Sequence, residues 1–244
     1  MEENVLILGA TSDMAVAIAR QLAMEGYSIT LAGRVSERLS AMECDLRIRY
    51  KAIVSSVYFN ALDFSSHEDF YHSLAEKPDI VICVFGLLGD QLEAQKNWQE
   101  CVNILHTNYT GAVSVLNVIA NDFERRKKGT LVGVSSVAGE RGRQSNYFYG
   151  SAKAGFTAYL SGLRNRLYHH GVHVLTVKPG FVKTKMIENL STPGILTASP
   201  EKVAGIISIA IRKKKNTVYI LPIWGLIMFI IKAIPENIFK KLRL

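Results

Sequence analysis

The sequence has few cysteines, and their spacing is not that of a bonded or metal-binding set. Its 244 residues include three cysteines, Cys44, Cys83 and Cys101, without a Cys-x-x-Cys pair. An odd number of widely spaced cysteines argues against a disulfide framework or a zinc site. We therefore expect reduced thiols, most of them buried, in a cytoplasmic protein.

Long apolar runs are also missing. The most apolar stretch, residues 223–231, has nine residues, whereas a transmembrane helix needs about 20. The first five residues include two glutamates and lead directly into a strand-like segment, so no signal peptide fits there. We expect a single chain without a membrane-spanning helix.

Acidic residues are scarce at the C-terminal end. Residues 212–244 contain eight Lys or Arg and one acid, Glu236, so nearly all of the formal net charge of +8 belongs to this segment. The lysines flank the apolar run 223–231, a combination that favours an anionic lipid surface over nucleic acid. We predict a body over residues 1–221 and an amphipathic helical tail over 222–244 that contacts the inner face of the membrane peripherally.

Apolar strand-like runs alternate with helix-like segments along the body. The predicted strands are 5–8, 28–32, 57–60, 80–85, 130–135, 172–177 and 218–221. The predicted helices are 14–25, 98–126, one that bears Tyr149 and runs towards residue 170, and 200–213. Repeated strand–helix units predict an α/β fold, a Rossmann-type doubly wound parallel sheet forming one domain. Ligands of such sheets bind beyond the carboxyl ends of the strands.

The turn after the first strand is a candidate phosphate cradle. Gly9 permits a tight turn, and the following amides, from Thr11 to Met14, can receive a pyrophosphate at the start of a helix. Asp13 and Ala15 stand where a Gly-x-x-x-Gly-x-Gly frame has glycines. Asp13 either lies near the pyrophosphate or caps the helix with its carboxylate.

Two further residues bear on the cofactor. Arg34 follows Gly33 at the end of the second strand, where NAD-binding proteins place an acid and where an arginine suits a 2′-phosphate. This favours NADP over NAD, unless Arg34 is a solvated residue at a helix start. Asp63 is placed either to touch the adenine edge or to cap the next helix.

The catalytic signal is a hydroxyl, a phenol and an ammonium in one short span. Tyr149 and Lys153 are four residues apart, so a helix places both side chains on one face. An ammonium favours the ionised form of a neighbouring phenol and predicts a lowered phenol pKa. Ser136 precedes them and can hydrogen-bond the same reacting oxygen.

Together and in this order, these motifs resemble the short-chain dehydrogenase/reductase family over residues 4–221. The residues that carry the resemblance are Gly9, Gly33, Arg34, Asn108, Ser136, Tyr149, Lys153, Pro179, Gly180, Val182 and Thr184. It implies that Tyr149 exchanges the proton, Ser136 orients the substrate oxygen and Lys153 lowers the phenol pKa and binds the nicotinamide ribose. It also implies that Asn108 holds a water that relays protons to Lys153, and that the protein is a dimer or tetramer. By the same resemblance Pro179, Gly180, Val182 and Thr184 contact the cofactor, with Thr184 at the nicotinamide carboxamide.

One family motif is replaced, which indicates a divergent subgroup. Residues 84–91, Val-Phe-Gly-Leu-Leu-Gly-Asp-Gln, stand where an Asn-Asn-Ala-Gly-like motif is usual, although Gly86 still lets the backbone approach a cofactor. This segment, residues 139–146 and the basic apolar tail resemble the decaprenylphosphoryl-2-ketoribose reductase subgroup. That resemblance implies reduction of a keto-sugar on a polyprenyl phosphate, in the synthesis of a cell-wall sugar donor. Arg141 and Arg143 are then candidates for the lipid phosphate, or else solvated loop residues.

Other functions stay open at this point. A reductase of acyl, sterol or retinoid-like ketones would use the tail as a lid over its substrate, and a non-catalytic dinucleotide-binding protein would explain the altered first turn. His169, His170 and His173 span a helix end and a strand start, so we expect their rings to diverge and predict no metal site.

Overall fold

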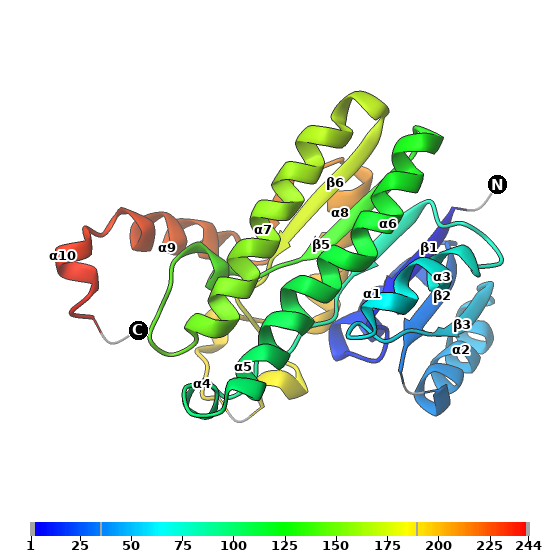
Figure 1. Cartoon of the computed structure of the whole chain (residues 1–244). Helices are drawn as coiled ribbons and strands as arrows, with labels where there is room; N and C mark the ends of the chain where they lie inside the picture. Colours follow the sequence, from blue (N-terminus) through cyan, green and yellow to red (C-terminus); the bar gives the residue numbers. More distant parts are fainter. Residues whose placement is uncertain (1–2, 35, 189, 243–244) are drawn as a thin grey trace.

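A seven-stranded parallel sheet forms the centre of the computed structural model, which describes residues 3–34, 36–188 and 190–242 (Figure 1). The strand order is β3-β2-β1-β4-β5-β6-β9. The strands are β1 Asn4–Leu8, β2 Ser28–Gly33, β3 Val54–Tyr58, β4 Ile80–Cys83, β5 Gly129–Val134, β6 Val172–Lys178 and β9 Thr217–Tyr219, with a separate pair β7 Phe181–Val182 and β8 Thr197–Ala198. The predicted doubly wound sheet is confirmed.

Helices cover both faces of this sheet. They are α1 Asp13–Met24, α2 Ser36–Tyr50, α3 His67–His72, α4 Gln91–Ala94, α5 Trp98–Leu105, α6 Gly111–Arg126, α7 Tyr147–Leu167, α8 Pro200–Arg212, α9 Pro222–Ala233 and α10 Glu236–Phe239. Figure 1 shows α9 and α10 at the opposite side of the molecule from β2 and β3. Within the described residues, no helix is both long and apolar enough to cross a membrane.

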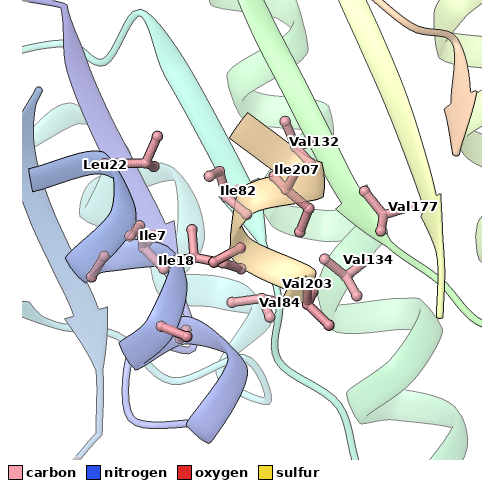
Figure 2. Packing of buried hydrophobic residues seen from close by; sticks show 14 of the residues in the cluster. Ile7, Ile18, Leu22, Ile82, Val84, Val132, Val134, Val177, Val203 and Ile207 are labelled. Carbon is pink, nitrogen blue, oxygen red and sulfur yellow. The ribbon is translucent and has the colours of Figure 1, made fainter. Parts of the chain in front are cut away.

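The alternation of side chains along the strands produces two cores. Val5 and Ile7 of β1 face α1, α2 and α8, whereas Leu6 and Leu8 face α3, α6 and α7. Figure 2 shows the first core, where Ile18 of α1 and Ile207 of α8 meet the sheet. Both faces are apolar because strands of a parallel sheet are buried on both sides. Of the cysteines, Cys83 and Cys101 are buried and Cys44 is exposed.

Several predicted boundaries differ from the structure, three of them near the candidate site. Strand β3 begins at Val54 and ends at Tyr58, earlier than the apolar run suggested, because an edge strand tolerates small polar residues such as Ser55. Strand β4 ends at Cys83 instead of residue 85. The helix expected over residues 98–126 is interrupted by a π-helical turn, His106–Thr110.

The order of strands in the sheet switches sides at β1. Strands β2 and β3 lie on one side of β1, and β4 and the later strands lie on the other. The helices that follow β1 and β4 in the chain, α1 and α6, pack on opposite faces of the sheet. A crevice therefore forms beyond the carboxyl ends of these two strands. The two cavities described next lie along this edge.

Candidate active site

The turn after β1 is built tightly around Gly9. Its φ of +87° lies in the left-handed region, and a Cβ there would come within 2.6 Å of the Phe85 Cβ. The amides of Gly9 and Ala10 both donate to the carbonyl of Ala32, at 2.9 and 3.0 Å. The loop after β4 and the loop after β1 can approach each other this closely because residue 9 has no side chain.

Ser12, not Asp13, caps the helix that follows. The Ser12 hydroxyl accepts from the Ala15 amide at 3.2 Å. The prediction that Asp13 caps α1 is therefore wrong, because Asp13 is already the first helical residue and its carboxylate points elsewhere. Its Oδ2 accepts from the Lys185 amide at 2.8 Å, and its Oδ1 lies 3.7 Å from Nη2 of Arg38. Asp13 thus joins α1 to the segment that follows β7.

A first cavity of about 410 Å³ opens beside this turn. Its lining comes from the end of β2, the segments that follow β1, β2, β3 and β4, α5 and the π-helical turn: Gly9, Thr11, Ser12, Gly33, Arg34, Phe59, Asn60, Ala61, Leu62, Phe85, Gly86, Leu87, Asn103 and Thr107. Arg34 is exposed, and no Asp or Glu is among these described lining residues. This lining suits a phosphorylated dinucleotide. Three glycines let the backbone approach it, the amides at the start of a helix can bind phosphate, and one arginine adds positive charge.

Asp63 lies outside this lining. It is exposed and accepts from the Ser65 hydroxyl at 2.8 Å, just before a 3₁₀ turn, Phe64–Ser66, and its side chain makes no capping hydrogen bond. Asn60 occupies the cavity wall instead. The shift follows from the early end of β3 at Tyr58, which brings the next residues, not Asp63, to the edge of the sheet.

The π-helical turn positions Asn108 beneath the loop that replaces the missing family motif. Asn108 is buried, donates to the carbonyls of Leu87 and Ile104 at 2.6 and 2.8 Å, and accepts from the Leu87 amide at 3.2 Å. Its Oδ1 would lie 2.9 Å from a Cβ on Gly86. Asn108 therefore fixes the loop after β4, and Gly86 fits there because it has no side chain.

Ser136, Tyr149 and Lys153 converge at the end of β5 and the first turns of α7. Ser136 is extended, and its hydroxyl accepts from the Ala138 amide at 3.1 Å. Lys153 is buried, donates to the Val134 carbonyl at 3.1 Å and lies 5.7 Å from the centroid of the Tyr149 ring. The structure thus brings together the three residues predicted from the sequence.

The surroundings of Tyr149 and Lys153 shift the pKa of both side chains. Burial raises the pKa of Tyr149 to about 12, although a hydrogen bond with Ser136 opposes the shift. Burial lowers the pKa of Lys153 to about 8. The expected lowering of the phenol pKa by Lys153 is therefore wrong for the protein by itself, because desolvation of the phenol dominates. Tyr149 holds its proton at neutral pH, as a proton donor must.

A second cavity of about 410 Å³ begins where the first ends, since Gly86 and Leu87 line one and Leu88 and Gly89 line the other. It contains Ser136 and Tyr149. Its other lining residues are Met14, Asp90, Gln91, Leu92, Ser135, Val137, Ala138, Arg143, Ser145, Asn146, Pro179, Gly180, Phe181, Val182, Thr184, Met186, Ile187, Leu190 and Trp224. Pro179, Gly180, Val182 and Thr184, predicted as cofactor contacts, lie in this wall, and so does Met14.

The two candidate phosphate-binding arginines have different surroundings. Arg141 donates to the carbonyls of Ile231 and Ile234 at 2.7 and 2.6 Å, and its guanidinium lies 3.7 Å from the Phe239 ring centroid. It also pairs with Glu236 at 3.0 Å. Arg141 is thus used to hold the end of α9, so neither the lipid-phosphate role nor the solvated alternative fits it.

Arg143 lines the second cavity. Within the described residues its side chain makes no ion pair and no hydrogen bond, and its Nε is fully buried. Burial lowers the pKa of this guanidinium. Arg143 is therefore free to meet a ligand.

Outside the cavities, the three histidines have separate neighbours. His170 lies 3.4 Å from Glu124, and His173 shares a hydrogen bond of 3.0 Å with the Lys215 carbonyl. Among the residues that the structure describes, no group of three potential ligands is close enough to hold a metal ion.

The sequence is similar to a known family and to several oxidoreductases. The family model for short chain dehydrogenases matches residues 3–193. An uncharacterized oxidoreductase of Mycobacterium tuberculosis is 37% identical over 243 residues, covering 98% of this chain and 96% of that protein. A 3-oxoacyl-(acyl-carrier-protein) reductase of Aquifex aeolicus is 28% identical over 216 residues, covering 83% of this chain and 87% of that protein.

Solved structures share the fold. A short-chain dehydrogenase from Burkholderia cenocepacia, in complex with NADP, is similar with a TM-score of 0.84 at 19% identity, and the match covers 100% of this chain and 98% of that one. The similarity extends over the sheet and both helical layers.

Proposed function

Because this chain belongs to the short-chain dehydrogenase/reductase family, we propose that it reduces a ketone to a secondary alcohol with NADPH. The observation that carries the proposal is the grouping of Ser136, Tyr149 and Lys153 where the glycine-lined first cavity meets the second. A non-catalytic dinucleotide-binding protein would not need this set. Because Ser136 and Tyr149 line the second cavity, we propose that the reaction takes place there.

The choice of NADP rests on the charge of the first cavity. Arg34 stands at the end of β2, and the described lining contains no carboxylate to bind a ribose 2′-hydroxyl. A guanidinium suits a 2′-phosphate. The Burkholderia cenocepacia structure, which contains NADP, is consistent with this choice. Gly9, Ser12 and Gly86 would hold the dinucleotide, with Lys153 at its ribose and Thr184 at its carboxamide.

The protein's own groups handle the proton. When bound, the cofactor supplies hydride to the carbonyl carbon. Tyr149 gives its phenolic proton to the carbonyl oxygen, and Ser136 orients that oxygen by hydrogen bonding. The Lys153 ammonium stabilises the phenolate that remains, and Asn108 fixes the loop beneath it. The raised pKa of Tyr149 keeps its phenol protonated at neutral pH, which is the form that reduction requires.

For the substrate, we propose a keto-sugar carried on a polyprenyl phosphate. The lining of the second cavity includes apolar residues, such as Leu92, Phe181 and Trp224, and polar ones, such as Arg143. An amphiphilic ketone matches both kinds of residue, and Arg143 is the candidate for its phosphate. A second candidate, an acyl or similarly apolar ketone, is favoured by the likeness to the Aquifex aeolicus reductase. In that case α9 serves as a lid.

We further propose that residues 222–244 attach the body, residues 1–221, to the inner face of the membrane. Helix α9 buries Trp224 and Met228 against the body. Leu226 and Phe229 face outward and are 61% and 70% exposed. Lys240 and Lys241 follow this helix in the sequence, a pattern that suits anionic headgroups. Lys232, in contrast, is paired with the Glu140 carboxylate at 2.6 Å.

Assembly is proposed as a homodimer or homotetramer through α5, α6 and α7, which light scattering of the purified protein would test.

The function itself is tested by following NADPH and NADH oxidation with a keto-sugar lipid, an acyl ketone and a sterol ketone. We expect turnover with NADPH and the keto-sugar lipid. Absence of turnover with every ketone, despite cofactor binding, would contradict the proposal.

A further inference from the structure

Three polar side chains in the wall of the second cavity have buried atoms without hydrogen-bond partners in the described structure. These atoms are Nε2 of Gln91, Nε of Arg143 and Oδ1 of Asn146. Buried polar groups in folded proteins are nearly always paired, so three exceptions in one cavity require an explanation. Two similar atoms elsewhere, Arg126 Nε and Glu140 Oε2, face charged partners at 2.7 and 2.6 Å.

Several other polar groups of this wall already have partners within the protein. Ser135 Oγ bonds to Thr157 and to the Lys153 carbonyl, and Asp90 Oδ1 accepts two amides at the start of α4. Thr184 donates to the Val182 carbonyl at 3.2 Å. Among the described residues of this wall, the buried side-chain atoms that lack a partner belong to Gln91, Arg143 and Asn146.

The side chain of Gln91 and the backbone of Asn146 are bonded to the helix turn that carries Tyr149. The Oε1 atom of Gln91 accepts from the amide of Phe148 at 3.2 Å, so its NH₂ group is directed away from that bond. Asn146 precedes α7 by one residue, and its carbonyl accepts from the Gly150 amide at 2.8 Å.

Arg143 completes the set with a charged donor. It pairs with no carboxylate among the described residues, and its Nε is enclosed by protein. A guanidinium in such a place is satisfied by oxygen atoms of a ligand, neutral or anionic. Gln91 and Arg143 each offer a hydrogen-bond donor, and Asn146 offers an acceptor. The donors match ether, hydroxyl or phosphate oxygens of a ligand, and the acceptor matches a hydroxyl group.

We propose that Gln91, Arg143 and Asn146 form a specificity pocket that binds oxygen atoms next to the reacting carbonyl and selects hydroxylated ketones over apolar ones. This inference rests on the proposed reductase function and deepens it. A ketone without hydroxyl groups leaves the three atoms unpaired. Sites built to bind a hydroxyl discriminate against analogues that lack it by about 10⁴-fold in favourable cases.

The test compares two five-membered-ring ketones with NADPH: a methyl pentofuranosid-2-ulose, which has hydroxyl groups, and cyclopentanone, which has none. Gln91→Met removes the amide donor at nearly the same chain length, together with the acceptor of the Phe148 amide, and Arg143→Met removes the guanidinium and leaves a shorter apolar chain. We expect each to lower kcat/KM for the keto-sugar by about 10- to 100-fold and to change kcat/KM for cyclopentanone less than about threefold, as loss of a substrate hydrogen bond predicts. Gln144→Met, an exposed neighbour outside the cavity wall, is the matched control and should change neither value.

The outcomes separate this inference from the reductase function. If the wild type reduces both ketones equally well, or if the variants affect both equally, the pocket does not set specificity although the enzyme is a reductase. If neither ketone is reduced, binding of methyl arabinofuranoside to the NADP-loaded protein is measured by calorimetry. Binding that weakens in both Met variants supports the pocket even then, and no binding to the wild type overturns it.

Discussion

The indole ring of Trp224 lies directly on Gly180. A Cβ at position 180 would come within 2.0 Å of both Cε2 and Nε1 of that ring. The indole Nε1 donates to the Leu196 carbonyl at 3.0 Å, and the ring meets that of Phe181 edge-on. Helix α9 is therefore packed into the wall of the second cavity and cannot be removed without opening it.

Gly180→Ala tests this packing. The added methyl group must displace Trp224, and overpacking of this kind costs about 1–3 kcal/mol of the free energy of unfolding. We expect a lower melting temperature and a lower kcat, measured by calorimetry and NADPH oxidation. Gly194→Ala is the control because no atom lies within 4 Å of the place that its added methyl group would take. Equal stability of the two variants would show that α9 is not held as described.

The pH dependence of reduction should follow Lys153. Burial lowers the pKa of Lys153 to about 8 and raises that of Tyr149 to about 12. As pH rises, the ammonium loses its proton first, while the phenol keeps its own. We expect kcat/KM for reduction to be constant at neutral pH and to fall above about pH 8. Melting temperatures over the same range separate titration from unfolding, and a constant rate far into the alkaline range would contradict the role of Lys153.

Arg34 should decide between the two nicotinamide cofactors. Replacing it with alanine removes a charge-assisted contact to the 2′-phosphate, worth about 1.5–3 kcal/mol. We expect Arg34→Ala to weaken NADPH binding by about 10- to 100-fold and to leave NADH binding unchanged. Titration of cofactor fluorescence measures both values. Arg49→Ala, on α2 and away from the cavities, should change neither; an unchanged NADPH affinity in Arg34→Ala would exclude Arg34 from the site.

The membrane proposal predicts an effect of charge on the outward face of α9. The double variant Leu226→Glu, Phe229→Glu places two acids in this exposed apolar surface without touching the buried Trp224. Since burial of one such side chain contributes about 1.5–3 kcal/mol, binding to phosphatidylglycerol vesicles should weaken at least about tenfold in co-sedimentation. Ile48→Glu, an exposed apolar residue on α2, is the control. Equal sedimentation of the wild type and both variants would overturn the proposal.

Much of the fold and of the candidate site could be predicted because the signals are local in sequence. Short apolar strands, Gly9 in a tight turn, and Tyr149 four residues before Lys153 each leave a pattern in a short window. The parallel sheet then brings the ends of β1, β4 and β5 to one edge, so the site follows from its parts.

The remaining features depend on contacts between distant segments. Arg141 meets carbonyls 90 and 93 residues away at the end of α9, and Asp13 accepts from the amide of Lys185. The position of Asp63 depended on where β3 ends, which the apolar pattern misplaced. The unpaired atoms of Gln91 and Asn146 give no sequence signal, because amide side chains look alike whether satisfied or not.

The central claim is that the Tyr149 phenol donates the proton to a carbonyl, and Tyr149→Phe tests it most directly. The variant keeps the ring and removes the hydroxyl, so we predict a loss of NADPH-dependent turnover of about 10²- to 10⁴-fold with an unchanged dissociation constant for NADPH. Tyr147→Phe, an exposed residue two positions earlier, should behave as the wild type. A Tyr149→Phe enzyme that retains more than about a tenth of wild-type turnover, far above the range expected for losing a general acid, would contradict the account.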